Sequence, residues 1–526
     1  MMKASMAESL AGGGNRKKIT FLTSSEYGQA NVILAVVHEL LLLQTYEIHV
    51  ASFSPLEKRI QDINELVPNN AFPARFHTVT GTSALEALAN KNEFIGPFPP
   101  GIRGASKTYR ITLPAIATTW DEKEYMMGYE SCIDILRCTS PDLIVIDPLM
   151  SQGLEACKAI SRSCVILSPN TFQEICKKQQ PLFTQLCRWP AVSSAFPYPV
   201  PWYLIPANIF LKIRLLWILI TSPKVKEMIS WRQARGLPKL SPVFNIWEKE
   251  NQYLLVSTPE TDYPCYVPPN VTPCGPILPP FRSVQEQDPK LCAWLEASPT
   301  ILINLGSHIR MDDEMARQFA MGLKVVLEKL PNVQVLWKLK TSGGLSVSRA
   351  KTTSGFTVTG AKKESLKAID PFTATGRVKV IEWLSVDPLA VLQSGHVICS
   401  VHHGGSNSFH EALRCAYPLF TSVRMLTIDS AGVPQVILPC WLDTLDFANR
   451  VEWLGIGVYG SRSAAPSVEA GELSRALFKV LGYTPEVARM KEKARELAAI
   501  SARPGGRKKA CEKIIEIVES TQQSSS

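Results

Sequence analysis

Short apolar runs alternate with helical stretches along the first half of the chain. Residues 19–24 predict a buried strand, residues 32–43 a buried helix, and residues 46–53 the next strand. Strand, helix and strand form the unit of a parallel sheet, and the pattern recurs at residues 142–146 and 163–167. We therefore expect an α/β domain over residues 19–255, preceded by a disordered polar tail over residues 1–18.

The pattern changes after residue 255 and then resumes. Eight prolines lie between residues 257 and 282, which predicts a stiff linker without regular structure over residues 256–290. Strands are then expected at 300–305, 333–339, 378–382, 397–401 and 435–438, with a helix at 314–329. These define a second α/β domain over residues 291–484. Residues 485–526 predict closing helices, broken at 504–506, and a tail.

This order predicts two doubly wound, Rossmann-like domains that face each other across a central cleft. Open α/β sheets bind ligands at the carboxyl ends of their strands, so we expect one ligand in each domain.

Composition excludes several classes of protein. Hydrophobic residues make up 45% of the chain, which is ordinary for a globular protein with a large core. The net charge of +9 comes from scattered basic residues, so no nucleic-acid partner is expected. Thirteen cysteines without a CxxC pair indicate reduced thiols in a cytoplasmic protein, and the polar start lacks a secretory signal. No HxH or HExxH motif is present, and no metal site is expected.

The most apolar window spans residues 202–220. It contains Pro206, Asn208, Lys212 and Arg214, so we do not expect a transmembrane helix. The pattern favours a buried helix beside an apolar pocket. A membrane-surface helix, making a peripheral contact with lipid, is the alternative.

The strongest motif follows an apolar strand and opens a helix, at residues 401–411. Its glycines permit close approach of a ligand, and a helix N-terminus presents free N–H groups and a positive dipole to an anion. His403 is a candidate donor to a phosphate oxygen, and Glu411, one turn into the helix, a candidate acceptor for two ribose hydroxyls. The motif therefore predicts a phosphate-binding loop for a nucleotide.

This motif resembles that of the family 1 nucleotide-sugar-dependent glycosyltransferases, which have the GT-B fold and use mainly UDP-sugars. The resemblance continues through residues 431–439, 441–444 and 447–452. Residues 303–307 resemble the family's donor loop, 274–279 its interdomain segment, and 503–514 its closing helix, which returns to the first domain.

The resemblance implies roles for individual residues in a UDP-sugar site. His403 would bind the phosphates, with backbone groups of Gly405 and Asn407 nearby, and Glu411 would bind the ribose. Trp383 is the candidate for stacking on uracil, although core packing is the alternative for both Trp383 and Trp441. The expected donor site comprises Ser307, Trp383, His403, Gly405, Ser406, Asn407, Ser408, Glu411, Trp441, Asp443 and Thr444. Asp443 would bind sugar hydroxyls, and Thr444 replaces the family's usual Gln, which leaves the sugar open.

The acceptor side lacks the family's catalytic base. The family has a histidine after the first strand, where this chain has Gln29, and an amide is no general base near neutral pH. Asp147 matches the aspartate that orients this histidine, and a strand-end turn former is its alternative role. Three alternatives follow. In the first, Asp147 or Glu26 is the base; in the second, the acceptor is itself acidic and needs little base. In the third, the protein binds a nucleotide sugar without catalysis. His38 is expected to be structural.

Together these features predict an inverting transfer of a glucose-type hexose from a UDP-sugar to a lipophilic acceptor, such as a phenolic, polyketide or sterol. No cofactor beyond the co-substrate is expected. Phe196, Tyr198, Trp202 and Tyr203 suggest the walls of the acceptor pocket. The alternatives are a nucleotide-sugar-binding pseudoenzyme and a GT-B-like nucleotide-sugar epimerase.

A segment of 16 residues interrupts the donor motif between Cys415 and Ser430. Without it, residues 411–414 would join residues 431–434 as they do in the family. The segment has no helical or alternating pattern, so we hypothesise that it is a retained intron rather than a genuine loop. It is expected to separate Glu411 from Asp443 and to expose an apolar patch.

Overall fold

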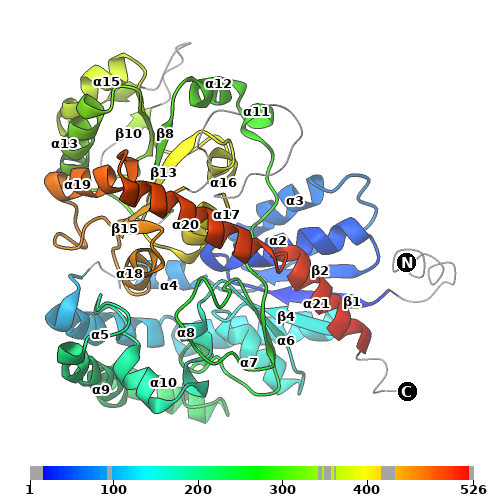
Figure 1. The fold of residues 1–526 in the computed structure, drawn as a ribbon. Helices are drawn as coiled ribbons and strands as arrows, with labels where there is room; N and C mark the ends of the chain where they lie inside the picture. Colours follow the sequence, from blue (N-terminus) through cyan, green and yellow to red (C-terminus); the bar gives the residue numbers. More distant parts are fainter. Residues whose placement is uncertain are drawn as a thin grey trace.

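Two parallel sheets with helices on their faces form the protein (Figure 1). The structure is a computed structural model, and it describes residues 16–91, 98–307, 309–341, 346–348, 357–359, 363–415 and 433–520. Most of the segment 415–430, for which a retained intron is hypothesised, lies outside the described residues.

The first sheet has seven strands in the order β3-β2-β1-β4-β5-β6-β7. Its strands are β1 (Lys18–Leu22), β2 (Glu47–Ser52), β3 (Arg75–Thr78), β4 (Leu143–Ile146), β5 (Val165–Ser168), β6 (Gln252–Leu255) and β7 (Val271–Pro273), and every neighbouring pair is parallel. The longer helices of this half are α2 (Tyr27–Leu43), α3 (Glu57–Glu65), α4 (Ala84–Asn90), α5 (Gly101–Ala117), α6 (Glu122–Thr139), α7 (Ser151–Ala159), α9 (Ile205–Thr221) and α10 (Pro223–Ala234), with the short α8 (Phe172–Ile175).

The expectation that residues 256–290 lack regular structure is wrong at β7 and at the short helix α11 (Val284–Gln287). This strand pairs with β6 and forms an edge of the first sheet, so the sheet extends past residue 255. Pro273 is tolerated there because an edge strand needs no backbone donor on its free side.

The second sheet has six parallel strands in the order β12-β9-β8-β13-β14-β15. They are β8 (Thr300–Asn304), β9 (Gln334–Lys338), β12 (Val378–Ile381), β13 (Val397–His402), β14 (Gln435–Ile437) and β15 (Gly457–Tyr459). The helices around it include α12 (Pro289–Ala297), α13 (Asp313–Lys329), α16 (Pro388–Leu392), α17 (Ser406–Cys415), α18 (Thr444–Leu454) and α19 (Ala470–Leu481). Its core packs Ile301, Val335 and Val401 against apolar side chains of α13 and α19.

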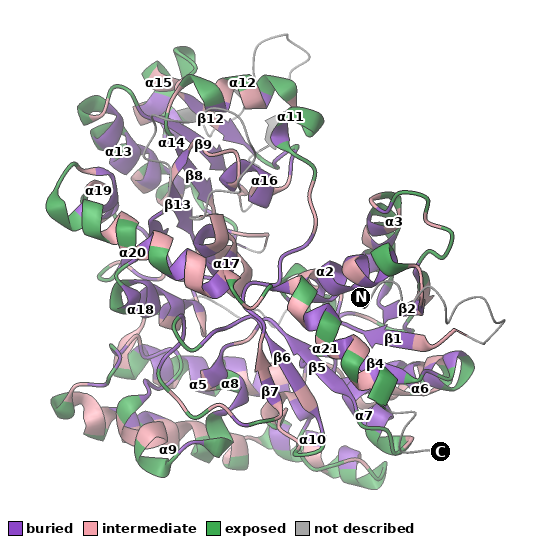
Figure 2. Cartoon of the chain, turned by 45° about the vertical axis from the view of Figure 1, so that its right-hand side comes forward, coloured by how far each residue is buried: buried purple, intermediate pink, exposed green. Residues whose placement is uncertain are grey.

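The closing helices connect the two halves. Helix α20 (Pro485–Ala502) packs on the second half, and α21 (Arg507–Ser520) crosses to α2, where Arg507 Nε donates to Glu39 Oε1 at 2.6 Å (Figures 1 and 2). Ile514 and Val518 of α21 complete the core of the first half. The predicted return of the closing helix to the first domain is thus confirmed.

The two segments that cross between the halves touch each other. Gly506 N donates to Cys274 O at 2.8 Å, and a Cβ on Gly275 would lie 2.1 Å from the carbonyl oxygen of Ser501. Gly275 also has a φ of +77°, so glycine is required here both for backbone conformation and for the close approach of the two segments.

Candidate functional site

The carboxyl ends of five neighbouring strands bring the predicted donor residues to one edge of the second sheet. In spatial order, Trp383 follows β12, Lys338 ends β9, Ser307 follows β8, His403 follows β13, and Asp443 follows β14. Parallel strands all end at the same edge, which is the usual ligand-binding side of an α/β sheet. Residues up to 136 positions apart in the chain therefore lie along one face.

Two glycines enclose the imidazole of His403. A Cβ on Gly306 would lie 2.7 Å from His403 Cε1, and a Cβ on Gly405 would lie 2.6 Å from its Nε2. Gly404 has a φ of +88°, which turns the chain from β13 into α17. Any larger residue at Gly306 or Gly405 would displace the ring, so the predicted loop positions His403 at the N-terminus of α17.

The adjacent histidine is structural. His402 Nδ1 accepts a hydrogen bond from Gly404 N at 3.1 Å, so its Nε2 carries the proton and donates to Gln435 Oε1 at 2.9 Å. Burial lowers the pKa of His402 to about 4. His402 is thus a neutral ring that connects β13 to β14.

Two lysines that sequence reasoning missed lie beside the donor loop. Lys338 Nζ donates to Gly306 O at 3.2 Å and lies 3.9 Å from the ring centroid of Trp383. Lys340 Nζ donates to Ser307 O at 2.8 Å. Burial, with a contribution from Lys340, lowers the pKa of Lys338 to about 8. The signal in the sequence was a pair of lysines at the end of a buried strand, which is an unusual place for charge.

The two tryptophans differ in their surroundings. Trp383 is 53% exposed, so core packing does not explain it, and Lys338 covers one of its faces. Trp441 packs partly against the second core, with its ring centroid 6.4 Å from that of His403. Trp383 thus offers an aromatic face at the edge, and Trp441 supports the loop.

Two carboxyl groups at this edge have strongly raised pKa values. Burial raises the pKa of Glu411 to about 8, Asp387 adds to the rise, and Lys338 opposes it. Burial and the nearby Glu174 raise the pKa of Asp443 to about 7. Asp443 occupies the N-cap position of α18, but its side chain makes no capping hydrogen bond to the helix. Perturbed acids gathered at one sheet edge are typical of functional sites.

Ser406 and Asn407 contact the first half of the chain. Ser406 Oγ donates to Pro169 O at 2.6 Å, and Asn407 Nδ2 donates to Tyr27 O at 3.2 Å. Pro169 follows β5, and Tyr27 follows the turn after β1. These two bonds place the carboxyl edges of the two sheets against each other.

The side chain of Thr444 is used within its own turn. It is 1% exposed, and its hydroxyl accepts from Cys440 N at 3.2 Å and Trp441 N at 3.1 Å while donating to Trp441 O. Ser408 is half-buried in the first turn of α17. The hydroxyl of Thr444 closes the turn before α18 and faces no open surface.

The two halves of the donor motif are adjacent despite the interruption between them. Strand β14 pairs directly with β13, and Gln435 Nε2 donates to Phe409 O of α17 at 3.4 Å. A Cβ on Gly404 would lie 2.8 Å from Thr444 O. The segment therefore does not separate β14 from the donor loop, since β13 and β14 pair directly, whereas the expected separation of Glu411 from Asp443 stays a prediction.

On the acceptor side, Asp147 is completely buried and makes four hydrogen bonds. Its Oδ2 accepts from Thr23 Oγ1 at 2.6 Å and Ser24 N at 2.5 Å, while its Oδ1 accepts from Leu149 N and Met150 N. Burial raises the pKa of Asp147, and the nearby Glu26 adds to the rise. These contacts tie the turn after β1 to the turn after β4 and favour the alternative role, a strand-end turn former.

Glu26 lies in the turn after β1, and Gln29 lies in the first turn of the following helix α2. Gln29 is buried, and its Oε1 has no hydrogen-bond partner among the described residues. Glu26 precedes α2, and its Oε1 accepts from Leu85 N at 3.2 Å. His38 is remote from this turn, since it is buried near the far end of α2. Burial lowers the pKa of His38, and the positive charge of Arg507 lowers it further.

The helix α9 does not wall a buried pocket. Trp202 and Tyr203 are 82% and 63% exposed, whereas Phe196 and Tyr198 are buried. Tyr198 stacks on Tyr263 at 4.1 Å between ring centroids. The prediction of a buried helix at 202–220 is therefore wrong, because only one face of this helix, with Asn208, Leu211 and Ile218, is buried, whereas apolar side chains of the opposite face are exposed.

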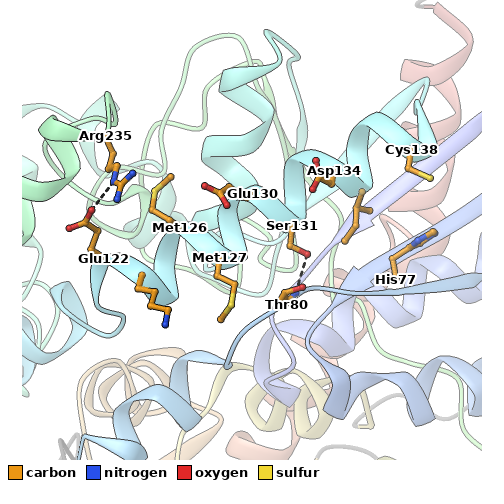
Figure 3. Close-up of a pocket in the computed structure, with 12 residues that line it drawn as sticks. His77, Thr80, Glu122, Met126, Met127, Glu130, Ser131, Asp134, Cys138 and Arg235 are labelled. Carbon is orange, nitrogen blue, oxygen red and sulfur yellow. Dashed lines mark hydrogen bonds and ion pairs between the residues drawn. The ribbon is translucent and has the colours of Figure 1, made fainter.

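A separate pocket of about 910 Å³ lies on α6 (Figure 3). Its lining includes His77, Glu130 and Asp134, and the ion pair of Glu122 with Arg235 closes one side. All its lining residues belong to the first half, and none is a predicted donor residue. Among the residues that the structure describes, no group of three or more potential metal ligands gathers.

Comparison with known proteins agrees with this arrangement. No protein-family model matches the chain. Glycosyltransferase sdnJ of Sordaria araneosa is 33% identical over 94% of this chain and 97% of its own length. Two solved structures cover 96% of this chain and 99% of theirs: the glycotransferase of kitacinnamycin (TM-score 0.59, 16% identity) and a UDP-glucosyltransferase from Polygonum tinctorium (TM-score 0.58, 15% identity). The relative that extends over nearly the whole chain, together with the two facing parallel sheets, shows that this protein belongs to the family 1 glycosyltransferases of the GT-B fold.

Proposed function

We propose that the protein transfers a hexose from a UDP-sugar to a hydroxyl group of a lipophilic small molecule, with inversion at the anomeric carbon. The observation that supports this most is the bond from Asn407 Nδ2 to Tyr27 O at 3.2 Å. It places the donor loop directly against the turn that would receive the acceptor. The two substrates would then meet where the carboxyl edges of the two sheets meet.

The donor would lie along the edge of the second sheet. The N–H groups at the start of α17 and the ammonium of Lys338 supply positive potential for a diphosphate, and His403 would donate a hydrogen bond to one of its oxygens. Trp383 offers a face for stacking of the base, and Glu411 accepts hydroxyls of the ribose. Asp443 and Trp441 then lie on the side nearer the sugar. Thr444, whose hydroxyl is used within its own turn, is left out of the donor site.

In the proposed reaction, the acceptor oxygen attacks the anomeric carbon from the face opposite the diphosphate. The bond between that carbon and the diphosphate oxygen breaks, and UDP leaves with the electron pair. The charge that develops on UDP is stabilised by α17, His403 and Lys338. The proton of the acceptor hydroxyl passes to a base on the first half of the chain.

We infer that Glu26 is this base. Asp147 is fully buried with both oxygens hydrogen-bonded, so it has no path to the acceptor. Glu26 immediately precedes Tyr27 and is only partly buried as a residue, and its Oε2 is a buried atom without a hydrogen-bond partner among the described residues. In the Glu26→Gln variant, transfer to an alcohol should fall by about 10²–10⁴-fold, because general-base help is lost. UDP affinity should not change, since Glu26 lies outside the donor edge.

A lipophilic acceptor is supported by the side chains around the turn. Tyr27, Leu85 and Leu149 are 47%, 37% and 38% exposed, and the last two donate backbone hydrogen bonds to Glu26 and Asp147. Large apolar side chains left partly open beside polar groups are typical of small-molecule binding surfaces. An acceptor with an apolar body and one hydroxyl would fit this surface.

The test is a thermal-shift titration of the whole chain with UDP, UDP-glucose, UDP-glucuronate and UDP-GlcNAc, followed by product analysis with phenolic and sterol acceptors. A ligand that binds only the folded state raises stability by about 2.7 kcal/mol at 100 times its Kd. Stabilisation with glycoside formation supports the proposal. Stabilisation without transfer or donor hydrolysis would indicate a nucleotide-sugar-binding pseudoenzyme, and conversion of one UDP-sugar into another an epimerase. No stabilisation by any uridine nucleotide would refute the donor assignment.

A further inference from the structure

Helix α9 has its polar side chains turned towards the protein. Asn208 is completely buried, accepts from Ala191 N at 2.7 Å, and donates to the carbonyl oxygens of Leu186 and Trp189. Lys212, one turn later, donates from Nζ to Trp189 O at 2.8 Å. These bonds hold one face of the helix against the preceding loop.

The opposite face of α9 is an exposed apolar stripe. Phe210, Ile213, Trp217 and Ile220 follow the i, i+3, i+7, i+10 spacing of one helix face, and each is at least 50% exposed. The neighbouring exposed apolar residues are Leu182, Phe183, Trp202, Tyr203 and Leu216. Figure 2 shows α9 at the periphery of the molecule, coloured mostly as intermediate and exposed. A stripe of this size on a soluble surface is unfavourable unless something covers it.

The charge around this stripe identifies what covers it. Residues 175–226 include seven basic residues and no acidic one. They are Lys177, Lys178, Arg188, Lys212, Arg214, Lys224 and Lys226, of which Lys212 is turned towards the protein and does not contribute to the outer surface. Two copies of such a surface would repel each other, whereas the headgroups of an anionic lipid bilayer would attract it. Exposed tryptophan and tyrosine beside basic residues are also typical of the membrane–water interface.

We propose that α9 docks the enzyme on an anionic membrane surface, with its apolar stripe in the headgroup and upper acyl region. The segment Trp202–Thr221 is long and apolar enough to span a bilayer by length and composition. Spanning would break the bonds of Asn208 and Lys212 and bury an asparagine and two basic residues in hydrocarbon. The helix therefore lies on the membrane and stays part of the folded first half. This inference stands without the proposed reaction.

Vesicle flotation tests the docking. The purified full chain is mixed with vesicles of phosphatidylcholine alone or with about one third phosphatidylserine, and the floating fraction is measured. We expect the wild-type chain to float with the anionic vesicles. The double variant Ile213→Glu/Trp217→Glu should bind at least tenfold more weakly, because two charges replace apolar side chains in the interface. The matched control Met321→Glu/Tyr483→Glu changes two apolar residues that are also exposed, outside α9, and should float as wild type does.

A second pair of variants tests the charge. Arg214→Gln and Lys226→Gln should each weaken binding to anionic vesicles by about fivefold, the factor that corresponds to about 1 kcal/mol per basic residue at the surface. Binding should also weaken as salt is raised. Far-UV circular dichroism and thermal unfolding check that each variant folds. If Ile213→Glu/Trp217→Glu does not fold, Phe210→Ser/Ile220→Ser replaces it.

Three outcomes would overturn the proposal. The wild-type chain fails to float with anionic vesicles, or the folded α9 variants float as well as wild type does. In the third, sedimentation velocity shows a wild-type dimer that Ile213→Glu/Trp217→Glu converts to a monomer while vesicle binding stays absent. That result would assign the stripe to an interface between copies of this chain.

Discussion

Arg450 of α18 and Asp262 of the first half form an ion pair in which neither side chain is more than 1% exposed. Arg450 Nη2 also donates to Asp446 Oδ2 at 2.7 Å, and Asp262 Oδ2 accepts from Phe172 N at 2.8 Å. Since Asp443 stands at the start of α18, this pair ties the proposed sugar-binding end of the helix to the acceptor half. The junction between the halves is thus held by buried charge next to the site.

Arg450→Ala should lower the free energy of unfolding by about 3–5 kcal/mol, because it leaves the buried carboxylate of Asp262 and the partly buried one of Asp446 without their cation. The measurement is urea unfolding followed by fluorescence. The matched control is Arg462→Ala, which removes a partly exposed pair with Glu452 and should cost about 0–1 kcal/mol. Equal costs for the two variants would show that the buried pair contributes no more than a surface pair.

His403→Ala should weaken UDP binding by about 1–3 kcal/mol, the scale of a hydrogen bond to a charged group. Isothermal titration calorimetry measures it. His396→Ala is the matched control, because His396 precedes β13 at the opposite edge of the sheet and should leave affinity unchanged. Unchanged affinity in a folded His403→Ala variant would remove His403 from the donor site.

UDP affinity should pass through a maximum near pH 8. Glu411, with its pKa raised to about 8, becomes a charged acceptor for ribose hydroxyls as the pH rises. Lys338, with its pKa lowered to about 8, loses its charge over the same range. Titrations with UDP between pH 6.5 and 9.5 should show that the affinity of Glu411→Gln only falls as the pH rises. Over the same range, the affinity of Lys338→Met should only rise. A flat wild-type profile would contradict the assignment of both groups.

The raised pKa of Glu411 also predicts the pH dependence of stability. The protonated Glu411 carboxyl contributes to stability fully below about pH 4.5, the ordinary pKa of glutamate. This contribution is lost as the pH rises through about 8, where the buried carboxyl must ionise. Glu411→Gln should therefore raise the Tm of the unliganded protein at pH 9 relative to wild type. At pH 4.5 the two proteins should unfold at similar temperatures, and a difference there as large as at pH 9 would contradict this cause.

Gln29→His should raise transfer to a weakly acidic alcohol more than transfer to a phenol, because base help matters most for poor nucleophiles and is worth about 10²–10⁴-fold. Initial rates with the two acceptors at saturating donor measure the effect. Equal changes for both acceptors would show that a histidine introduced at this helix position does not act as a base.

Deleting residues 415–430 tests the hypothesis of a retained intron, together with sequencing of the transcript. The deleted chain should bind UDP-sugar and turn over better than the full chain, since it restores the family's direct connection between residues 414 and 431. If the full chain performs as well, the segment is a tolerated loop. The adjacency of β13 and β14 allows that outcome, because the donor edge is assembled around the interruption.

The sequence by itself determined the two sheets and the donor loop. Strands such as β8 and β13 are continuous apolar runs buried on both faces, and a glycine turn before a polar helix start permits few alternatives. The carboxyl edge follows, because parallel strands bring their C-terminal residues together whatever their distance in the chain.

Only the tertiary structure decided which side of an element faces inwards and which polar groups are already paired. Periodicity separates the two faces of α9 but does not say that Asn208 meets backbone carbonyl oxygens while Trp217 meets solvent. Likewise Thr444 and Asp147 look like free polar groups in the sequence, yet both are used within turns. Lys338 joins the site through a neighbouring strand that no local pattern connects to Gly306. These outcomes depend on contacts between distant segments, which propensity and spacing do not encode.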